Sequence, residues 1–213
     1  MTNVTLIDYG SGNLLNVARA FEHLGAEVTI VEDGSLLEQA GLLVLPGVGA
    51  FADGMQQLAE RGFIEPVRRH AAAGKPFLGI CLGMQMMLEG SSEFGSHAGL
   101  GLVAGQVDRI PETCADGRPH KIPHIGWNEL RLPAGRASWE DSILRGLPEG
   151  EAMYFVHSYR ALPAEPADLL AECDYDGIPV CAAIQKGRLW GCQFHPEKSG
   201  ESGLRILKNF LEC

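Results

Sequence analysis

The amino-acid sequence predicts an α/β protein with a mostly parallel central sheet, helices on both faces, and antiparallel additions in the second half. In the first half, short apolar segments alternate with segments of helical spacing, the rhythm that builds parallel sheets. In the second half, strand-like segments follow one another across turns rich in Gly, Pro and Asp. The 213 residues suit one α/β domain with a full core, so we expect a single domain over residues 1–213.

The elements of the first half follow in order. Residues 4–7 form a β-branched run, and the apolar spacing over residues 14–21 predicts a helix that ends at Gly25. The run 42–45 is wholly apolar, as expected of a strand that is covered on both faces. Further strands are predicted at residues 28–31 and 76–80, and further helices at 51–61, 66–73 and 83–88.

The second half predicts strands with few helices. A surface loop is expected at residues 162–166, where Pro163 and Pro166 interrupt the pattern. The chain closes on a helix over residues 202–211. The predicted strands are residues 103–110, 127–132, 152–157, 169–173, 180–185 and 189–194.

Composition excludes several classes of protein. The formal net charge of -10 argues against nucleic-acid binding, because phosphate backbones need a surplus of Lys and Arg. No apolar run approaches the ~18 residues of a membrane span, and the N-terminus lacks the pattern of a signal peptide. The six cysteines show no CxxC spacing. We therefore expect free thiols and a cytoplasmic protein.

The most informative segment places a cysteine at a strand-to-helix turn. Residues 77–85 read as an apolar strand, then Gly79-x-Cys81-x-Gly83, then a helix, which is the cysteine form of the nucleophile elbow. The helix N-terminus favours a thiolate at Cys81, and the first-turn N–H of Leu82 is suited to donate to an oxyanion. The alternative is a small buried cysteine in a glycine-rich turn.

A cysteine nucleophile needs a base that a third group orients. His195 follows the predicted strand 189–194, so it should lie at the same sheet edge as Cys81. Pro196 stiffens the link to Glu197, whose carboxylate can then turn back to hold the imidazole. The alternative is a loop histidine beside an unrelated glutamate.

A glycine-rich loop offers a rival function. Residues 47–52 contain Gly-x-Gly-x-x-Ala after a strand, a weak form of the dinucleotide-binding fingerprint. Pro46 interrupts the turn, and the next strand leads into Cys81 rather than into an acidic residue. We interpret residues 46–49 as a backbone donor loop, with the Val48 N–H as the second oxyanion contact.

Two histidines raise the question of a metal. His120 and His124 are four residues apart, but Pro119 and Pro123 prevent the helix that would pair them. We therefore expect no metal and no cofactor.

Several segments together resemble a known family. Gly79-Ile80-Cys81-Leu82-Gly83-Met84-Gln85, Pro46-Gly47-Val48-Gly49 and His195-Pro196-Glu197 resemble the class I (triad) glutamine amidotransferases. Residues 8–14, 123–128 and 195–199 are similar to the glutaminase subunits of imidazole glycerol phosphate synthase, an enzyme of histidine biosynthesis. The resemblance covers essentially the whole chain.

The resemblance implies a reaction and a substrate site. Cys81 would attack the glutamine carboxamide to form a thioester, His195 would transfer protons, and Glu197 would orient His195. Leu82 and Val48 would hold the oxyanion. By similarity, glutamine would also meet Gly47, Gly49, Gln85, Glu93, His157 and Ser158. Taken without the resemblance, Gln85 is an exposed helix residue and Glu93 a loop carboxylate.

The resemblance also implies a partner. In that family a separate cyclase with a (β/α)8-barrel fold receives the ammonia in a heterodimer and makes imidazole glycerol phosphate and aminoimidazole carboxamide ribonucleotide. Such a barrel needs ~200 residues or more, so this chain is too short to contain it. The implied partner and ammonia interface is Asn13, Trp127, Tyr159 and Lys198. For Trp127 alone, a core tryptophan is the alternative.

Two other functions stay open at the level of sequence. The same hydrolysis could serve another synthase, such as one of anthranilate or pyridoxal phosphate synthesis. The chain could also be a non-enzymatic or dinucleotide-binding α/β protein that keeps the fold.

Overall fold

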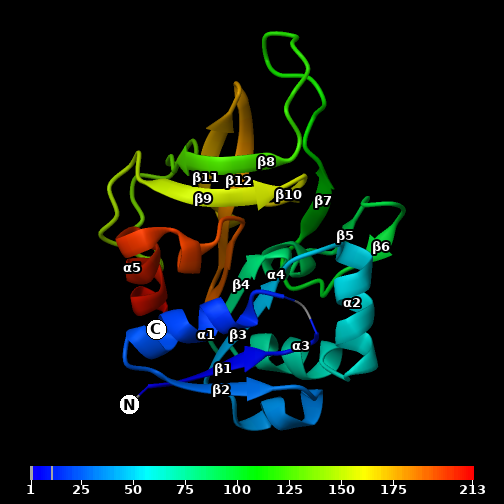
Figure 1. Ribbon diagram of the computed structural model, residues 1–213, viewed down its shortest axis with the longest axis vertical. Coiled ribbons are helices and arrows are strands. Elements are labelled where there is room, and N and C mark those ends of the chain that lie inside the picture. The colour runs from blue at the N-terminus through cyan, green and yellow to red at the C-terminus, as the bar shows by residue number, and fades with distance from the viewer. Residues whose placement is uncertain (1, 11) are drawn as a thin grey trace.

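The computed structural model describes residues 2–10 and 12–213. Seven strands form its main sheet: β1 (Asn3–Ile7), β2 (Glu27–Val31), β3 (Leu42–Gly47), β4 (Phe77–Cys81), β11 (Leu169–Tyr175), β12 (Ile178–Lys186) and β13 (Leu189–Cys192). Their order is β11-β12-β13-β4-β3-β1-β2 (Figure 1). The pairs β1–β2, β1–β3, β3–β4 and β4–β13 are parallel, and β12 and β11 join antiparallel at one edge. The predicted fold class is confirmed.

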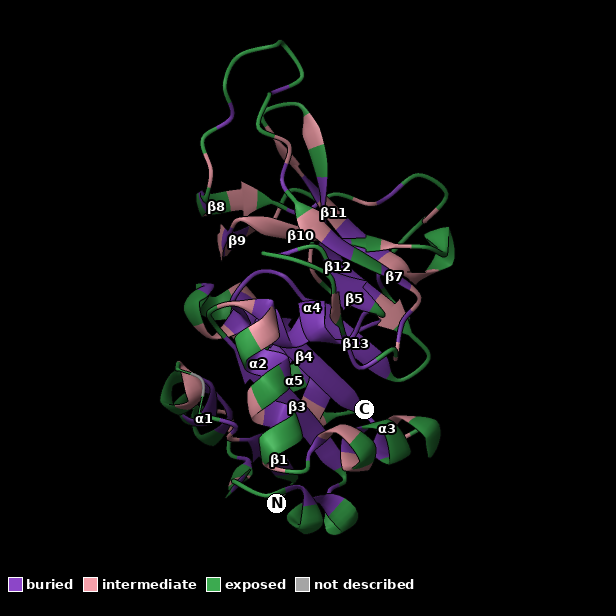
Figure 2. Ribbon diagram, turned by 90° about the vertical axis from the view of Figure 1, so that its right-hand side faces the viewer, coloured by how far each residue is buried: buried purple, intermediate pink, exposed green. Residues whose placement is uncertain are grey.

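Helices cover both faces of this sheet. They are α1 (Leu14–His23), α2 (Phe51–Glu60), α3 (Ile64–Ala72), α4 (Leu82–Met86) and α5 (Gly200–Leu211). On one face α1 and α5 pack together through Phe21 and Phe210, whose ring centroids are 6.3 Å apart. On the other face α2, α3 and α4 share a separate apolar core. Strands β3 and β4 are buried at every position, which explains why their sequences are apolar throughout (Figure 2).

The other strands of the second half form separate units. A four-stranded sheet runs in the order β10 (Tyr159–Pro163), β7 (Gly105–Arg109), β5 (Gly90–Ser91) and β6 (His97–Ala98). Strands β8 (His124–Glu129) and β9 (Ala152–His157) pair with each other as a two-stranded antiparallel ribbon. The sequence analysis placed all second-half strands in the central sheet. Turn composition identifies strands but not their partners, because pairing between distant segments is not encoded locally.

Short helices and element ends also differ from expectation. The described ranges contain three 3-10 helices: η1 (Gly34–Gln39), η2 (Pro166–Asp168) and η3 (Pro196–Lys198). The predicted loop 162–166 is wrong in its first part, because Leu162 and Pro163 end β10 as an edge strand that pairs with β7. Pro tolerates this position because an edge strand needs fewer backbone donors. No helix in the described ranges is long and apolar enough to cross a membrane.

The sheet order brings three chain segments to one edge. Strand β4 lies between β3 and β13 and is parallel to both, so all three end at the same side. Gly47, the last residue of β3, is in register with Cys81, the last residue of β4. The segment that follows β13 leads to His195 at the same side.

Candidate active site

Cys81 sits at a strained turn between β4 and α4. Its backbone has φ 54 and ψ -110, a sparsely populated conformation for a residue with a side chain. The flanking glycines make the turn possible. A Cβ at Gly83 would lie 1.8 Å from the Leu45 carbonyl oxygen, and a Cβ at Gly79 would lie 2.7 Å from the Gly83 carbonyl oxygen. The Gly-x-Cys-x-Gly pattern is therefore a steric requirement of this elbow.

His195 and Glu197 lie together and are buried. The His195 Nδ1 is 2.7 Å from Glu197 Oε1, and the side chains are 1% and 0% exposed. Because a carboxylate oxygen can only accept, Nδ1 carries the proton of this bond. The His195 backbone N–H donates to the Tyr154 carbonyl oxygen at 2.9 Å, and the Ser199 hydroxyl donates to the His195 carbonyl at 2.7 Å. The ring position is thus fixed from both its backbone and its side chain.

The side chain of Asn13 contacts both Glu197 and His195. Its Nδ2 donates to Glu197 Oε1 at 2.6 Å and lies 3.4 Å from His195 Nδ1. The Asn16 amide donates to Asn13 Oδ1 at 2.8 Å, so the Asn13 amide is oriented with its nitrogen toward the carboxylate. Sequence reasoning placed Asn13 only at a partner interface. Its 184-residue separation from Glu197 left no local signal for this contact.

The pKa of His195 is set by opposing effects. Burial alone would lower it, but interactions with the Cys81 sulfur and with the Glu197 carboxylate outweigh burial and raise the pKa to about 9. Among the residues that the structure describes, none hydrogen-bonds His195 Nε2, so that nitrogen can meet a substrate atom or the sulfur. The ring is therefore held mainly as an imidazolium at neutral pH.

A buried amide network lies beside the thiol. The Gln193 Nε2 is 3.8 Å from Cys81 Sγ, and the Val156 carbonyl oxygen is 4.0 Å from the same sulfur. Gln85 donates to Gln193 Oε1 at 2.9 Å and to the Tyr159 carbonyl at 3.0 Å. Gln85 is 5% exposed, so reading it as an exposed helix residue is wrong. Gln193 was missed, although a polar residue within an otherwise apolar run was a usable signal.

His157 belongs to a second histidine pair. Its Nδ1 lies 2.8 Å from the Tyr159 carbonyl oxygen and must donate to it, so its Nε2 accepts from His124 Nδ1 at 3.1 Å. Burial keeps both rings neutral, lowering the pKa of His157 to about 3 and that of His124 to about 4. This pair orders the backbone at the end of β9, beside the thiol.

The glycine loop after β3 lies beside the elbow. A Cβ at Gly47 would be 2.2 Å from Tyr9 Oη and 3.1 Å from Leu82 Cβ, so this strand end packs closely against the start of α4. Gly49 has φ +104, a conformation that favours glycine. Val48, between them, is 38% exposed. The loop thus brings the Val48 backbone to the same side as Leu82, the first residue of α4.

Glu93 and Ser158 have partners within the protein. The carboxylate of Glu93 accepts the Phe51 N–H at 2.6 Å, at the first turn of α2, where a helix has unpaired amides. This hydrogen bond connects the loop that carries Glu93 to α2, the helix that follows the glycine loop. The Ser158 carbonyl accepts the Ile110 N–H at 3.0 Å.

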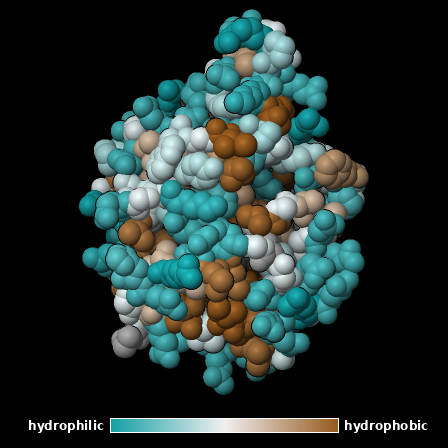
Figure 3. Space-filling view, in the orientation of Figure 1, coloured by the Kyte–Doolittle hydropathy of each residue, from teal (hydrophilic) through white to brown (hydrophobic). Residues whose placement is uncertain are grey.

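The residues assigned to a partner interface differ in environment. Trp127 is 59% exposed on β8, so the core-tryptophan alternative is wrong. Ile125, two residues earlier on the same face, is 57% exposed. Lys198 is exposed, and Tyr159 is half-buried with its ring centroid 6.5 Å from that of Phe94. In Figure 3 a small hydrophobic area lies over β8, among pale and hydrophilic residues.

Metal-ligating side chains gather away from this edge. Within the described residues, Cys114, His120 and Asp176 bring one ligand atom each to within 4.8 Å of one another. His124 is not part of that group, because its ring nitrogens face His157 and Asn128.

Comparisons of sequence agree with this geometry. The sequence model of the family described as "Glutamine amidotransferase class-I" matches residues 5–213. The chain is 53% identical over 212 residues to the imidazole glycerol phosphate synthase subunit HisH 1 of Legionella pneumophila (strain Lens), covering 100% of both chains. It is 46% identical over 210 residues to the subunit HisH of Syntrophotalea carbinolica, covering 97% of this chain and 98% of that one.

Comparisons of structure agree in fold. A solved structure described as a glutamine amidotransferase has a TM-score of 0.72 at 20% identity, covering 98% of this chain and 97% of that chain. A chain in the structure of PurLQS from Thermotoga maritima has a TM-score of 0.73 at 19% identity, with 99% and 97% covered. At such identities the likeness concerns the fold alone.

Proposed function

The chain belongs to the class I glutamine amidotransferase family, and we propose that it is the glutaminase subunit of an imidazole glycerol phosphate synthase. The full-length similarity to subunits of that name supports this assignment over the anthranilate and pyridoxal phosphate alternatives. The family match over residues 5–213 also speaks against a dinucleotide-binding protein. In this proposal residues 1–213 act as one domain with Cys81, His195 and Glu197 as the catalytic triad.

The first half of the reaction forms a thioester. The Cys81 sulfur attacks the carboxamide carbon of glutamine, and the developing oxyanion is held by the N–H groups of Leu82 and Val48. A His195 pKa of about 9 means that the acid needed by the leaving nitrogen is already present at neutral pH. His195 gives this proton to the nitrogen, and ammonia leaves.

The second half hydrolyses the thioester. Part of the raised pKa of His195 comes from the Cys81 sulfur. Once that sulfur is acylated it carries no negative charge, so the pKa of the ring falls and the neutral ring accepts a proton from water. The hydroxide attacks the thioester carbon, and glutamate leaves as Cys81 is regenerated. Glu197, held by Asn13, keeps the ring oriented in both halves.

The buried amides and the glycine loop supply a binding surface for glutamine. We propose that the backbone of Gly47 and Gly49 and the side chain of Gln85 line it, together with the end of β9 at His157 and Ser158. Glu93 acts there through the Phe51 amide and the loop before α2. The close approach of Gly47 to Tyr9 and Leu82 supports this role, since any side chain at position 47 would displace the loop.

The ammonia acceptor is a cyclase subunit with a (β/α)8-barrel fold that pairs with this chain as a heterodimer. The exposed Trp127 and Ile125 support a docking surface on the β8–β9 ribbon. Asn13, Tyr159 and Lys198 complete the proposed rim. The free cysteines support a reducing compartment, and we propose the cytoplasm.

The observation that carries the proposal is the strained Cys81 at one sheet edge with the buried His195–Glu197 pair. The test is Cys81→Ser, with the exposed thiol variant Cys213→Ser as control. Glutamine hydrolysis should disappear in Cys81→Ser and persist in Cys213→Ser, because serine leaves almost no anion for this base. The complex with cyclase should still use added ammonia. Substantial glutaminase activity in folded Cys81→Ser would overturn the mechanism.

A further inference from the structure

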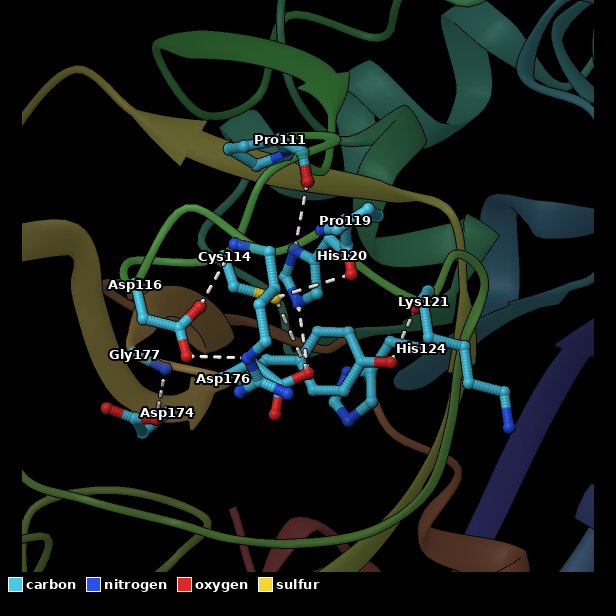
Figure 4. A network of polar contacts seen from close by, with 12 residues as sticks. Pro111, Cys114, Asp116, Pro119, His120, Lys121, His124, Asp174, Asp176 and Gly177 are labelled. Carbon is cyan, nitrogen blue, oxygen red and sulfur yellow. Dashed lines mark hydrogen bonds and ion pairs between the residues drawn. The ribbon is translucent and has the colours of Figure 1, made fainter.

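A cluster of three metal-ligating side chains lies outside the catalytic edge. Cys114 and His120 come from the long connection between β7 and β8, and Asp176 comes from the turn between β11 and β12. The His120 Nε2 is 3.7 Å from Asp176 Oδ2, and the Cys114 Sγ is 3.9 Å from the same oxygen (Figure 4). Two segments 62 residues apart in sequence thus present sulfur, nitrogen and oxygen to one point.

The burial and orientation of the His120 ring suit a metal ligand. Its side chain is 0% exposed, and its Nδ1 lies 2.9 Å from the Pro111 carbonyl oxygen. A carbonyl can only accept, so Nδ1 carries the hydrogen and Nε2 presents its lone pair to the cluster. Nε2 has no hydrogen-bond partner in the described part of the chain, and 3.7 Å to Asp176 is too long for one. A backbone carbonyl that orients the far nitrogen is the usual support of a metal-bound histidine.

The surroundings favour a cation. The Cys114 sulfur lies 3.8 Å from the Pro119 carbonyl oxygen and 3.9 Å from Asp176 Oδ2. The guanidinium of the neighbouring Arg118 is paired with Asp116 at 2.7 Å. The Asp176 Oδ2 atom is therefore directed at both the Cys114 sulfur and the His120 Nε2 atom.

We propose that Cys114, His120 and Asp176 form a three-ligand binding site for Zn²⁺. A thiolate, an imidazole and a carboxylate form a donor set that suits zinc and excludes Mg²⁺ and Ca²⁺, which prefer oxygen. Zinc bonds of about 2.0–2.3 Å place tetrahedral ligand atoms roughly 3.3–3.7 Å apart. The two observed distances to Asp176, 3.7 and 3.9 Å, need a closure of a few tenths of an ångström, and the third pair, Cys114 Sγ and His120 Nε2, lies within 4.8 Å and must close by up to about an ångström. A fourth position is left for water.

The ion would tie the connection between β7 and β8 to the β11–β12 turn. The Tyr175 ring packs at a tilt against His120, with ring centroids 4.4 Å apart, and stacks on His124, with centroids 3.9 Å apart. His124 in turn donates to His157. The ion would therefore stabilise the contact between these two segments, and the aromatic rings beside it extend to His157 at the end of β9. The sequence analysis expected no metal because it considered only neighbours of His120 along the chain.

The test uses the full chain after treatment with a chelator. Zn²⁺ uptake is measured by equilibrium dialysis, and Co²⁺ is titrated as a spectroscopic probe. Wild type should take up one equivalent of Zn²⁺ and give a thiolate-to-cobalt charge-transfer band. Cys114→Ser and Asp176→Asn should weaken binding by more than ~100-fold, since even outer contacts of metal ligands are worth 10- to 100-fold. Asn tolerates the positive φ of Asp176, 51°, so that variant keeps the turn.

Two controls separate this site from other thiols. Cys81→Ser and Cys213→Ser should keep both the uptake and the cobalt band, and Zn²⁺ should raise their melting temperatures as it does for wild type. Zn²⁺ should leave the melting temperature of Cys114→Ser unchanged. Absence of uptake by wild type would overturn the proposal. Undiminished uptake by folded Cys114→Ser and Asp176→Asn, or loss of the band in Cys81→Ser instead, would also overturn it.

Discussion

Asn13 provides a quantitative test of how the catalytic base is held. The Glu197 carboxylate is fully buried, and its Oε1 accepts from Asn13 at 2.6 Å and from His195 at 2.7 Å. Within residues 2–10 and 12–213, its Oε2 has no hydrogen-bond partner. Asn13 therefore supplies one of the two hydrogen bonds that these residues make to the buried charge. The variant to make is Asn13→Gly, because Asn13 has φ 74 and alanine would add unrelated backbone strain.

The expected loss follows from the strength of such a bond. A hydrogen bond to a charged group contributes about 1.5–3 kcal/mol. If the transition state loses all of it, kcat falls roughly 10- to 150-fold, since 1.36 kcal/mol corresponds to tenfold in rate. KM should change little, because the lost bond orients the base rather than glutamine. Asn13→Asp should be worse at neutral pH, since it places a second carboxylate against Glu197. Lower pH should partly relieve that loss, because a protonated carboxyl donates the same bond.

The assay must separate positioning from docking, since Asn13 also lies at the proposed partner rim. Glutaminase kinetics are measured at increasing cyclase concentration until the rate saturates. The loss in Asn13→Gly should persist at saturation, and Asn16→Ala should show a smaller loss because Asn16 orients the Asn13 amide. Asn3→Ala is the matched control, since its amide bonds Thr29 on the exposed end of the sheet. A rate for Asn13→Gly within twofold of wild type at saturating cyclase would refute the positioning role.

Four further predictions concern the partner, its nucleotide, the glycine loop and pH. In calorimetric titration, Trp127→Ala should weaken cyclase binding by ~2 kcal/mol, roughly 30-fold in Kd. A wild-type affinity for this variant would argue against the docking surface. Lys198→Ala should chiefly lower the stimulation of glutaminase activity by the cyclase's nucleotide. The subunit alone should hydrolyse glutamine ~100- to 1000-fold more slowly than the stimulated complex, mainly in kcat, because the peptide of Val48 between two glycines can rotate its N–H away from the oxyanion. Equal rates for subunit and complex would exclude this gate. The neutral His157, with its pKa lowered to about 3, binds fewer protons than the unfolded chain below pH 6.5, so stability falls on acidification, by about 2 kcal/mol at pH 5 from this group. Denaturant unfolding should show a shallower loss in His157→Gln, and an equal loss would contradict the assignment. The raised pKa of His195 acts in the opposite sense, with its stabilisation complete below pH 6.5 and lost as pH rises through about 9.

The features predicted correctly from the sequence are those that depend on residues close together along the chain. The parallel core followed from apolar runs such as β3, and the elbow followed from glycines at fixed spacing around Cys81. These patterns act through neighbours along the chain or through burial on both faces of one strand. The edge at which β4 and β13 end then follows from the geometry of parallel strands, which placed His195 beside Cys81.

The features missed are contacts between distant segments. Asn13 and Glu197 meet only because β1 and the segment after β13 reach one edge, and Gln193 meets Gln85 in the same way. The pairing of His124 with His157 depends on the register of β8 with β9. Residue type alone did not separate these pairs from ordinary polar residues, because many registers would have been compatible with the same turns.

The β8–β9 ribbon links the proposed docking surface to the chemistry. Trp127 faces solvent on β8 and is in register with Tyr154 on β9. The Tyr154 carbonyl accepts the His195 N–H, and the Val156 carbonyl lies 4.0 Å from Cys81 Sγ. The proposed catalytic residues His195 and Cys81 therefore both contact the backbone of β9, the strand paired with the one that carries the exposed Trp127. Because β9 is bonded to β8 along six residue pairs, a partner that shifts Trp127 must also shift these carbonyls. We expect the partner to act on the rate through this ribbon as well as through the glycine loop, so a variant that uncouples Trp127 from Tyr154 should lower stimulation more than it lowers binding.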